Sequence, residues 1–169
     1  MNRLFVGMDV HKEKVVMIGL PERGDTPILR ETFRGGNISG VVRRLQALTS
    51  SWAVESCYEA GPSGYGLARA STEAGISCQV VAPSLMPRRP GNLVKTDSRD
   101  AKELALALRA QMLQFVRIPS REEEEIRGLV RCREDIARQL RNFKQTVSHW
   151  LLCRCHRPPA KVKRWTPLF

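Results

Sequence analysis

The first part of the chain alternates short apolar runs with a segment of helical periodicity. Continuous apolar runs predict buried strands over residues 3–10 and 14–20, joined as a hairpin. Residues 28–33 are a third predicted strand. Between Ile38 and Leu48, apolar residues recur at steps of three and four, which predicts an amphipathic helix.

Further strands and helices follow as far as a proline at position 119. We predict strands over residues 52–58 and 77–81, a helix from Pro62 to about residue 74, and a helix over residues 97–110. Three hairpin-like strands followed by alternating helix and strand predict an α/β fold. The order is that of a ribonuclease-H-like (RuvC-like) mixed five-stranded sheet with flanking helices.

From Ser120 onward the pattern changes to a heptad repeat. Eight positions form an a/d seam: Ile126, Leu129, Arg133, Ile136, Leu140, Phe143, Val147 and Trp150. Ser120 and Glu123 form a capping box at its start. We therefore predict three parts: a domain over residues 1–118, a long basic coiled-coil-type helix over 119–157, ended by Pro158-Pro159, and an irregular tail over 158–169. The stripe suits a partner helix or packing on its own domain equally well.

Charge is distributed unevenly along the 169 residues, whose formal net charge is +11. Residues 1–116 carry 15 Lys/Arg against 11 Asp/Glu, whereas residues 117–169 carry 13 against 6. After Asp135 there are eight basic residues and no acidic one. A solvated basic face is one explanation. Contact with a polyanion explains the one-sided run better, because neutralised phosphates release counterions.

Other features narrow the class of protein. The chain has no apolar run of the roughly 20 residues that a membrane span requires, and its start lacks a secretory signal. Its five cysteines are irregularly spaced, which is typical of reduced thiols. We expect a cytoplasmic protein. A zinc site at His149, Cys153, Cys155 and His156 is disfavoured, because no second cysteine pair completes a usual spacing.

Four acidic residues stand out by position. Asp9 ends the first predicted strand, Glu59 follows the fourth, and Asp97 and Asp100 open a helix three residues apart. In a ribonuclease-H-like sheet the first and fourth strands are parallel neighbours, so their carboxylates would converge at the edge where ligands bind. Taken singly, each acid has an ordinary explanation, such as a helix cap or a strand end.

Convergence of all four acids would require a cation. Neighbouring carboxylates raise one another's pKa, and a divalent ion removes that conflict. Mg²⁺ (or Mn²⁺) would suit these oxygen ligands, and two such ions can clamp the oxygens of a phosphodiester under attack. We assign nucleic-acid contact to basic residues beside the acids and along the long helix: Arg88, Arg89, Lys95, Arg99, Arg138, Arg141 and Lys144.

Several segments resemble one known family. They are VGMDVHKEKVV (6–16), CYEAGPSGYGL (57–67), VVAPSLMPRRPGNLVKTDSRDA (80–101) and LVRCREDIARQLRNFKQ (129–145). The chain resembles the N-terminal domain of the DEDD-type insertion-sequence transposases, which are bridge-RNA-guided serine recombinases with a RuvC-like fold. The family's four metal-binding acids match Asp9, Glu59, Asp97 and Asp100.

The resemblance also implies partners and a missing part. It implies contact with target and donor DNA and with a structured guide (bridge) RNA, and assembly of the coiled-coil segment into dimers and tetramers. Family members continue into a second domain with a catalytic serine, and we expect this chain to stop before it and to be incompetent alone.

The sequence leaves two alternative functions to consider. One is a binding remnant that holds guide RNA or DNA and dimerises without catalysis. The other is a sugar-kinase or actin-like ATPase, which 169 residues without further phosphate loops do not support.

Overall fold

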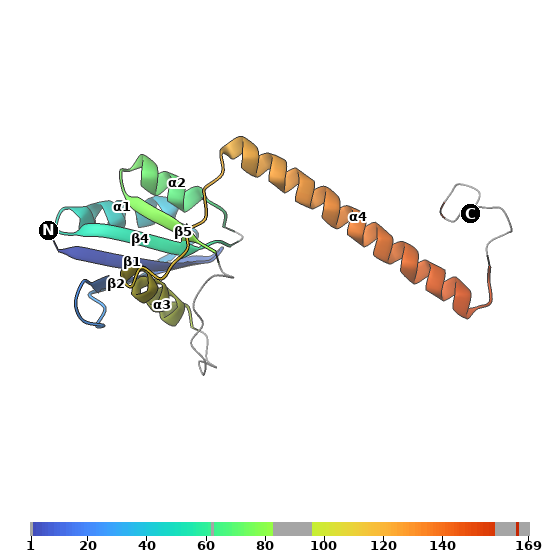
Figure 1. Ribbon diagram of the computed structural model, residues 1–169, viewed down its shortest axis with the longest axis horizontal. Coiled ribbons are helices and arrows are strands. Elements are labelled where there is room, and N and C mark those ends of the chain that lie inside the picture. The colour runs from blue at the N-terminus through green and yellow to red at the C-terminus, as the bar shows by residue number, and fades with distance from the viewer. Residues whose placement is uncertain (1, 62, 83–95, 158–164, 166–169) are drawn as a thin grey trace. The chain divides into compact units, whose positions relative to one another are not determined.

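The computed structural model describes residues 2–61, 63–82, 96–157 and 165. The chain divides after Ile118 into two compact units. The first unit holds the sheet and three helices, and the second holds one long helix (Figure 1).

A five-stranded sheet forms the centre of the first unit. Its strands are β1 (Arg3–Val10), β2 (Lys14–Pro21), β3 (Leu29–Arg34), β4 (Ala53–Glu59) and β5 (Ser77–Val81). They lie in the order β3-β2-β1-β4-β5, with β1 antiparallel to β2 and parallel to β4. The predicted mixed sheet of ribonuclease-H-like order is therefore confirmed, including the parallel pairing of the first and fourth strands.

Helices cover both faces of this sheet. They are α1 (Ile38–Thr49), α2 (Gly66–Glu73) and α3 (Asp97–Arg109). Leu4 and Met8 of β1 are buried in the same core as Val41 and Leu67, beneath α1 and α2. Phe5 alternates with them and is buried with Leu104 of α3. Figure 1 shows α1 and α2 on one side of the strands and α3 on the other.

Gly7 sets how closely α3 approaches β1. A Cβ at this position would lie 2.1 Å from the carbonyl oxygen of Ala101 and 2.5 Å from the amide nitrogen of Ala105. No side chain fits between the two backbones. Because β1 carries a glycine here, the first turns of α3 lie directly against the strand, next to its carboxyl end.

The start of α2 differs from the prediction from sequence. We placed the first helical turn at Pro62, which lies outside the described residues, but the helix begins at Gly66. Gly64 has a φ of 64°, which is incompatible with a right-handed helix. The hydroxyl of Tyr58 donates a hydrogen bond to the carbonyl of Gly64 at 3.0 Å and holds this turn in place.

The second unit is dominated by α4 (Arg121–Cys153), a helix of 33 residues. Ser120 and Glu123 form the expected capping box. The helix ends earlier than predicted, at Cys153 rather than at the two prolines, which lie outside the described residues. Cys155 has a φ of 57°, and the His156 amide donates to the carbonyl of Leu151 at 3.0 Å. These are features of a Schellman motif, which stops a helix without proline.

Candidate metal centre

Asp9 and Glu59 lie on adjacent parallel strands. Met8 of β1 pairs with Tyr58 of β4, so Asp9 and Glu59 are the next residues in register. Met8 and Tyr58 are both buried on the side of α1 and α2. Side chains alternate along a strand, so Asp9 and Glu59 belong to the face that α3 covers.

The first turn of α3 supplies the other two acids. Asp97 and Asp100 both lie in this turn, after the N-cap residue Thr96. Ala101, the next residue, is buried against Val16 and Ile18 of β2. Because Gly7 admits the helix backbone, the turn lies beside the carboxyl end of β1.

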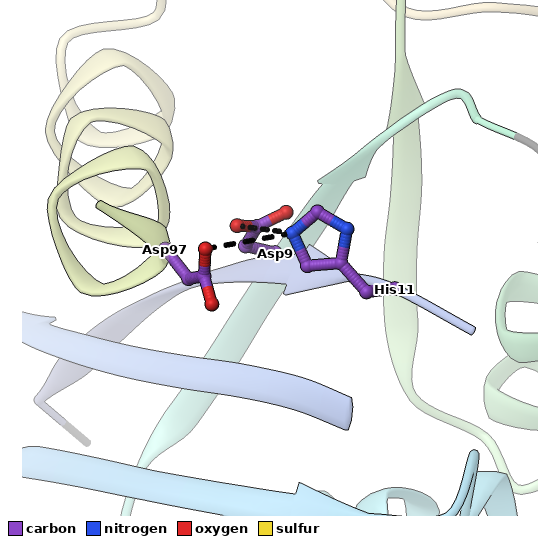
Figure 2. A group of neighbouring side chains, drawn as sticks. All are labelled: Asp9, His11 and Asp97. Carbon is purple, nitrogen blue, oxygen red and sulfur yellow. Dashed lines mark hydrogen bonds and ion pairs between the residues drawn. The ribbon is translucent and has the colours of Figure 1, made fainter. Parts of the chain in front are cut away.

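Three side chains meet at this edge, as Figure 2 shows. The Nε2 atom of His11 lies 3.0 Å from Oδ2 of Asp9 and 3.7 Å from Oδ1 of Asp97. One ligand atom from each of the three residues lies within 4.8 Å of the others. Over the described part of the chain this is the single group of three or more acidic, histidine or cysteine side chains that could hold a metal ion.

Lys14 contributes a fourth side chain. Its ammonium forms an ion pair with Oδ2 of Asp97. The lysine begins β2, and its carbonyl accepts a hydrogen bond of 2.8 Å from the His11 amide, which closes the four-residue turn of the hairpin. Asp97 therefore lies between two side chains of this one turn.

The two central carboxylates differ in their electrostatics. Burial raises the pKa of Asp9 above its ordinary value of 3.8, and the charges of Asp97 and Asp100 raise it further, while His11 acts in the opposite sense. The hydrogen bond from Lys14 lowers the pKa of Asp97. The side chain of Asp9 is 14% exposed and that of Asp97 32% exposed, so Asp9 has lost more of its contact with water.

The structure brings the four acids together to different degrees. Asp9 and Asp97 belong to the group of close ligand atoms, and Asp100 lies near enough to affect the ionisation of Asp9. Glu59 lies outside that group, at the end of β4, where it pairs with Val81 of β5. The structure therefore brings Asp9 and Asp97 into one group with His11, and the metal-binding role of the four acids stays a prediction.

His11 and Lys14 are not among the site residues that the sequence predicts. Both lie within five residues of Asp9, in the segment DVHKEK. A signal was present, because a four-residue hairpin turn directly after a strand-end carboxylate returns its last residue to the same edge. The spacing alone did not indicate that the turn would face α3 rather than solvent.

Comparison with known proteins identifies the family. Residues 6–153 match the family of DEDD transposases of IS110 type, described as "Transposase". The match covers most of the sheet, the residues of the candidate metal centre and α4. The chain belongs to this transposase family.

Two transposases illustrate the relationship to the family. A protein of Sinorhizobium fredii (strain NBRC 101917 / NGR234), named as transposase y4qE, is 41% identical over 166 residues, which are 96% of this chain and 42% of that protein. The transposase for insertion sequence element IS1533 of Leptospira borgpetersenii is 31% identical over 98% of this chain and 48% of its own length. The chain thus spans less than half the length of these family members.

Solved structures show more distant likeness. T. thermophilus RuvC in complex with Holliday junction substrate has a TM-score of 0.46 and 9% identity, over 68% of this chain and 99% of that one. The large terminase nuclease of thermophilic phage G20c with bound zinc has a TM-score of 0.47 and 16% identity, over 67% of this chain and 82% of that one. The fold assignment rests on the strand order and directions.

Of the seven residues predicted to bind nucleic acid, four lie within the described part of the chain. Arg88, Arg89 and Lys95 lie outside the described residues. Arg99 is exposed in the first turn of α3, between the two acids of that turn. On α4, Arg138 and Arg141 are exposed at outward heptad positions, whereas Lys144 flanks the seam and lies 5.8 Å from the ring centroid of Trp165.

The alternative metal site on α4 is not assembled. Cys153 and His149 approach to 3.5 Å, but no third ligand joins them among the described residues. All five cysteines are free thiols. Within the same described residues, no helix combines the length and apolar character needed to cross a bilayer.

Proposed function

We propose that this chain is the metal-binding, nucleic-acid-binding domain of an insertion-sequence transposase and acts in DNA transposition. The observation that carries the proposal is the meeting of Asp9 from β1 and Asp97 from α3 at the carboxyl edge of two parallel strands. In a chain of the DEDD transposase family, we assign these two residues, with Glu59 and Asp100, to the family's four acids.

A hard divalent cation fits the donors at this edge. Asp9 and Asp97 offer carboxylate oxygens and His11 a ring nitrogen, all close enough to share one ion. The raised pKa of Asp9 indicates that the protein alone does not fully offset the burial of its charge. We infer Mg²⁺ or Mn²⁺, because both ions prefer carboxylate and water oxygens as ligands. Such an ion, held by Asp9 and Asp97, would supply polarisation of a phosphodiester oxygen and activation of the attacking nucleophile.

The chain's own residues position the proposed metal ligands. Asp9 is held by rigid sheet backbone, and Asp97 by the first turn of a helix that Gly7 allows to lie against that sheet. In the tautomer that carries a proton on Nε2, His11 donates a hydrogen bond to Oδ2 of Asp9 and restricts the orientation of that carboxylate. Glu59, next in register to Asp9, and Asp100, one turn into α3, would complete the ligand set.

Nucleic acid is the proposed partner of the basic residues. Arg99 lies between the two acids of α3 and would contact a phosphate beside the reacting one. Arg138 and Arg141, on the outward face of α4, and Lys144 beside the seam would contact a nucleic-acid backbone together with Arg88, Arg89 and Lys95. The family resemblance extends the partners from DNA to a structured guide (bridge) RNA. A role on DNA agrees with the expected location in the prokaryotic cytosol or nucleoid.

Self-association is proposed for α4. None of its residues is buried, and the seven apolar residues of its seam are between 44% and 72% exposed. Fully burying one Leu or Phe contributes about 1.5–3 kcal/mol, so water is an unfavourable environment for such a stripe. We propose a homodimer or tetramer through residues 126–150. In this scheme residues 1–118 form the metal domain, 119–157 the assembly helix and 158–169 a tail.

Metal binding and strand cleavage test the proposal. Mn²⁺ or Mg²⁺ should raise the melting temperature of the chain, and Asp9→Asn or Asp97→Asn should remove the effect. Glu59→Gln and Asp100→Asn should weaken it. Glu55→Gln is the matched control, because Glu55 lies on the same strand as Glu59 but is paired with Arg3. An identical response to metal in Asp9→Asn and wild type would contradict the site.

The alternative is a remnant that binds nucleic acid and associates without cleaving it. Divalent-metal-dependent nicking of DNA by the chain, lost in Asp97→Asn, would favour the catalytic assignment. Binding of DNA or structured RNA with no cleavage under any metal would favour the remnant. Supplying the C-terminal half of a family member in trans distinguishes an incomplete enzyme from an inactive one.

A further inference from the structure

Lys14 occupies a position that the proposed metal ion also requires. Its ammonium is paired with Oδ2 of Asp97, while Oδ1 of the same carboxylate faces His11. Both oxygens of Asp97 are therefore already engaged by side chains of the β1–β2 hairpin. A cation that binds Asp97 must compete with these contacts.

The fold directs Lys14 toward Asp97. Val16 and Ile18 of β2 pack against Ala101 of α3, and Lys14 lies two residues before Val16, on the same face of the strand. The backbone of the turn is held at both ends, by the bond between His11 and Lys14 and by a 2.7 Å bond from the Gly35 amide to the carbonyl of Glu13. The ion pair is thus built on a fixed hairpin.

We propose that Lys14 is a positioning residue that competes with the divalent ion for Asp97. Its ammonium holds the first turn of α3 against the hairpin in the metal-free protein, and it is exchanged for the ion when the ion binds. The inference rests on the metal site proposed above. It makes Lys14 a determinant of metal affinity, although Lys14 is not itself a ligand.

Two consequences separate this role from a general electrostatic effect. Removing the ammonium should tighten metal binding, because the ion no longer displaces an ion pair. It should also destabilise the metal-free protein, because Asp97 then stands beside Asp9 and Asp100 without its counter-charge. Exposed ion pairs of this kind correspond to an effect of about two- to fivefold on an equilibrium constant.

The experiment measures Mn²⁺ affinity of the full 169-residue chain from the electron paramagnetic resonance signal of free Mn²⁺. The variants are Lys14→Met, Lys14→Arg, Asp97→Asn and, as matched control, Lys12→Met. Lys12 lies in the same turn, is exposed and loses the same charge, but has no ion pair with Asp97 among the described contacts. Melting temperatures in EDTA and in Mn²⁺ are recorded in parallel.

We expect Lys14→Met to bind Mn²⁺ about two- to fivefold more tightly than Lys12→Met and to melt at a lower temperature in EDTA. Lys14→Arg keeps the charge and should bind no more tightly than wild type. Equal affinity of Lys14→Met and Lys12→Met, or tighter binding by Lys14→Arg, would overturn the inference. If wild type and Asp97→Asn bind Mn²⁺ alike, the metal site itself is wrong. That result differs from one in which Asp97→Asn weakens Mn²⁺ binding but Lys14→Met does not change it, which would contradict only the role of Lys14.

Discussion

Asp9 and Asp97 are close neighbours whose ionisation is perturbed in opposite directions. Asp9 is the more buried of the two, and burial dominates its raised pKa. Asp97 is closer to solvent, and its contact with Lys14 dominates its lowered pKa. The same edge of the sheet thus contains one carboxylate that opposes folding when ionised and one that favours it.

These opposite shifts predict opposite effects of pH on the stability of the metal-free protein. Because the folded pKa of Asp9 lies above 3.8, the folded chain binds this proton more readily than the unfolded chain, so stability falls as pH rises from 3.8 through the folded pKa. The lowered pKa of Asp97 contributes stability that is present above 3.8 and is lost as pH falls through the folded pKa.

Urea unfolding in EDTA between about pH 3 and pH 7 measures both contributions. Asp9→Asn should remove the decline above 3.8, and Asp97→Asn should remove the loss below it. The exposed Glu22→Gln serves as the control for loss of an acidic residue. Profiles of Asp9→Asn and wild type that run parallel above this value would contradict the assignment.

At the scale of secondary structure, the approach of α3 to β1 determines whether the acids can meet. The contact depends on a position without a side chain, since a Cβ on Gly7 would overlap the backbone of Ala101 at 2.1 Å. Backbone cannot rotate away as a side chain does. The helix would have to move, and Asp97 and Asp100 would move with it.

Gly7→Ala should therefore destabilise the protein by about 1–3 kcal/mol or more, the usual range for overpacking a core, and should weaken metal binding. Gly66→Ala is the matched control, because its added Cβ would meet Ile38 at an ordinary 3.6 Å. Urea unfolding and Mn²⁺ titration of both variants provide the comparison. If Gly7→Ala is as stable as Gly66→Ala, the contact between α3 and β1 accommodates a Cβ at position 7, which contradicts the prediction.

The sequence predicts elements better than it predicts their ends or their contacts. Apolar runs located β1 and β2, because strands that are buried along most of their length have few polar positions. The other three strands mix buried and exposed positions and lie within one residue of the predicted ranges. The start of α2 was misplaced, since the left-handed conformation of Gly64 is not visible in a run of small residues. His11 and Lys14 were missed because their role depends on which way a turn faces, and hydrophobic periodicity contains no information about that.

The whole molecule combines a folded domain with a helix that carries two different faces. The apolar seam predicts that the chain is a dimer or larger in solution. Leu140→Asp with Phe143→Asp should give monomers or aggregates, because two charges enter the stripe, while the first unit stays folded. Asn142→Asp with Gln145→Asp adds the same charges at outward positions of α4 and should leave assembly unchanged. Light scattering that finds a monomeric wild type would refute the seam.

The outward face of α4 predicts salt-dependent binding of duplex DNA or structured RNA. The logarithm of the binding constant should fall with the logarithm of salt concentration by about 0.9 for each duplex phosphate contacted. Neutralising Arg138, Arg141 and Lys144 should flatten that slope, since fewer counterions are released. A control that neutralises the exposed Arg23, Arg30 and Arg43 of the first unit should flatten it less. Equal slopes in both triple variants would exclude α4 as the main contact surface.

The length of α4 sets a length scale for the proposed dimer. At about 1.5 Å per residue, its 33 residues measure about 50 Å, which is about 15 base pairs of B-form DNA. Only Pro119 and Ser120 separate the end of the first unit from this helix. A parallel pair of α4 helices would attach the two proposed metal domains at the same end of the pair, and an antiparallel pair would attach them at opposite ends. In the proposed dimer, the acidic first turn and the basic second half of α4 favour the antiparallel pair, because opposite charges then lie side by side.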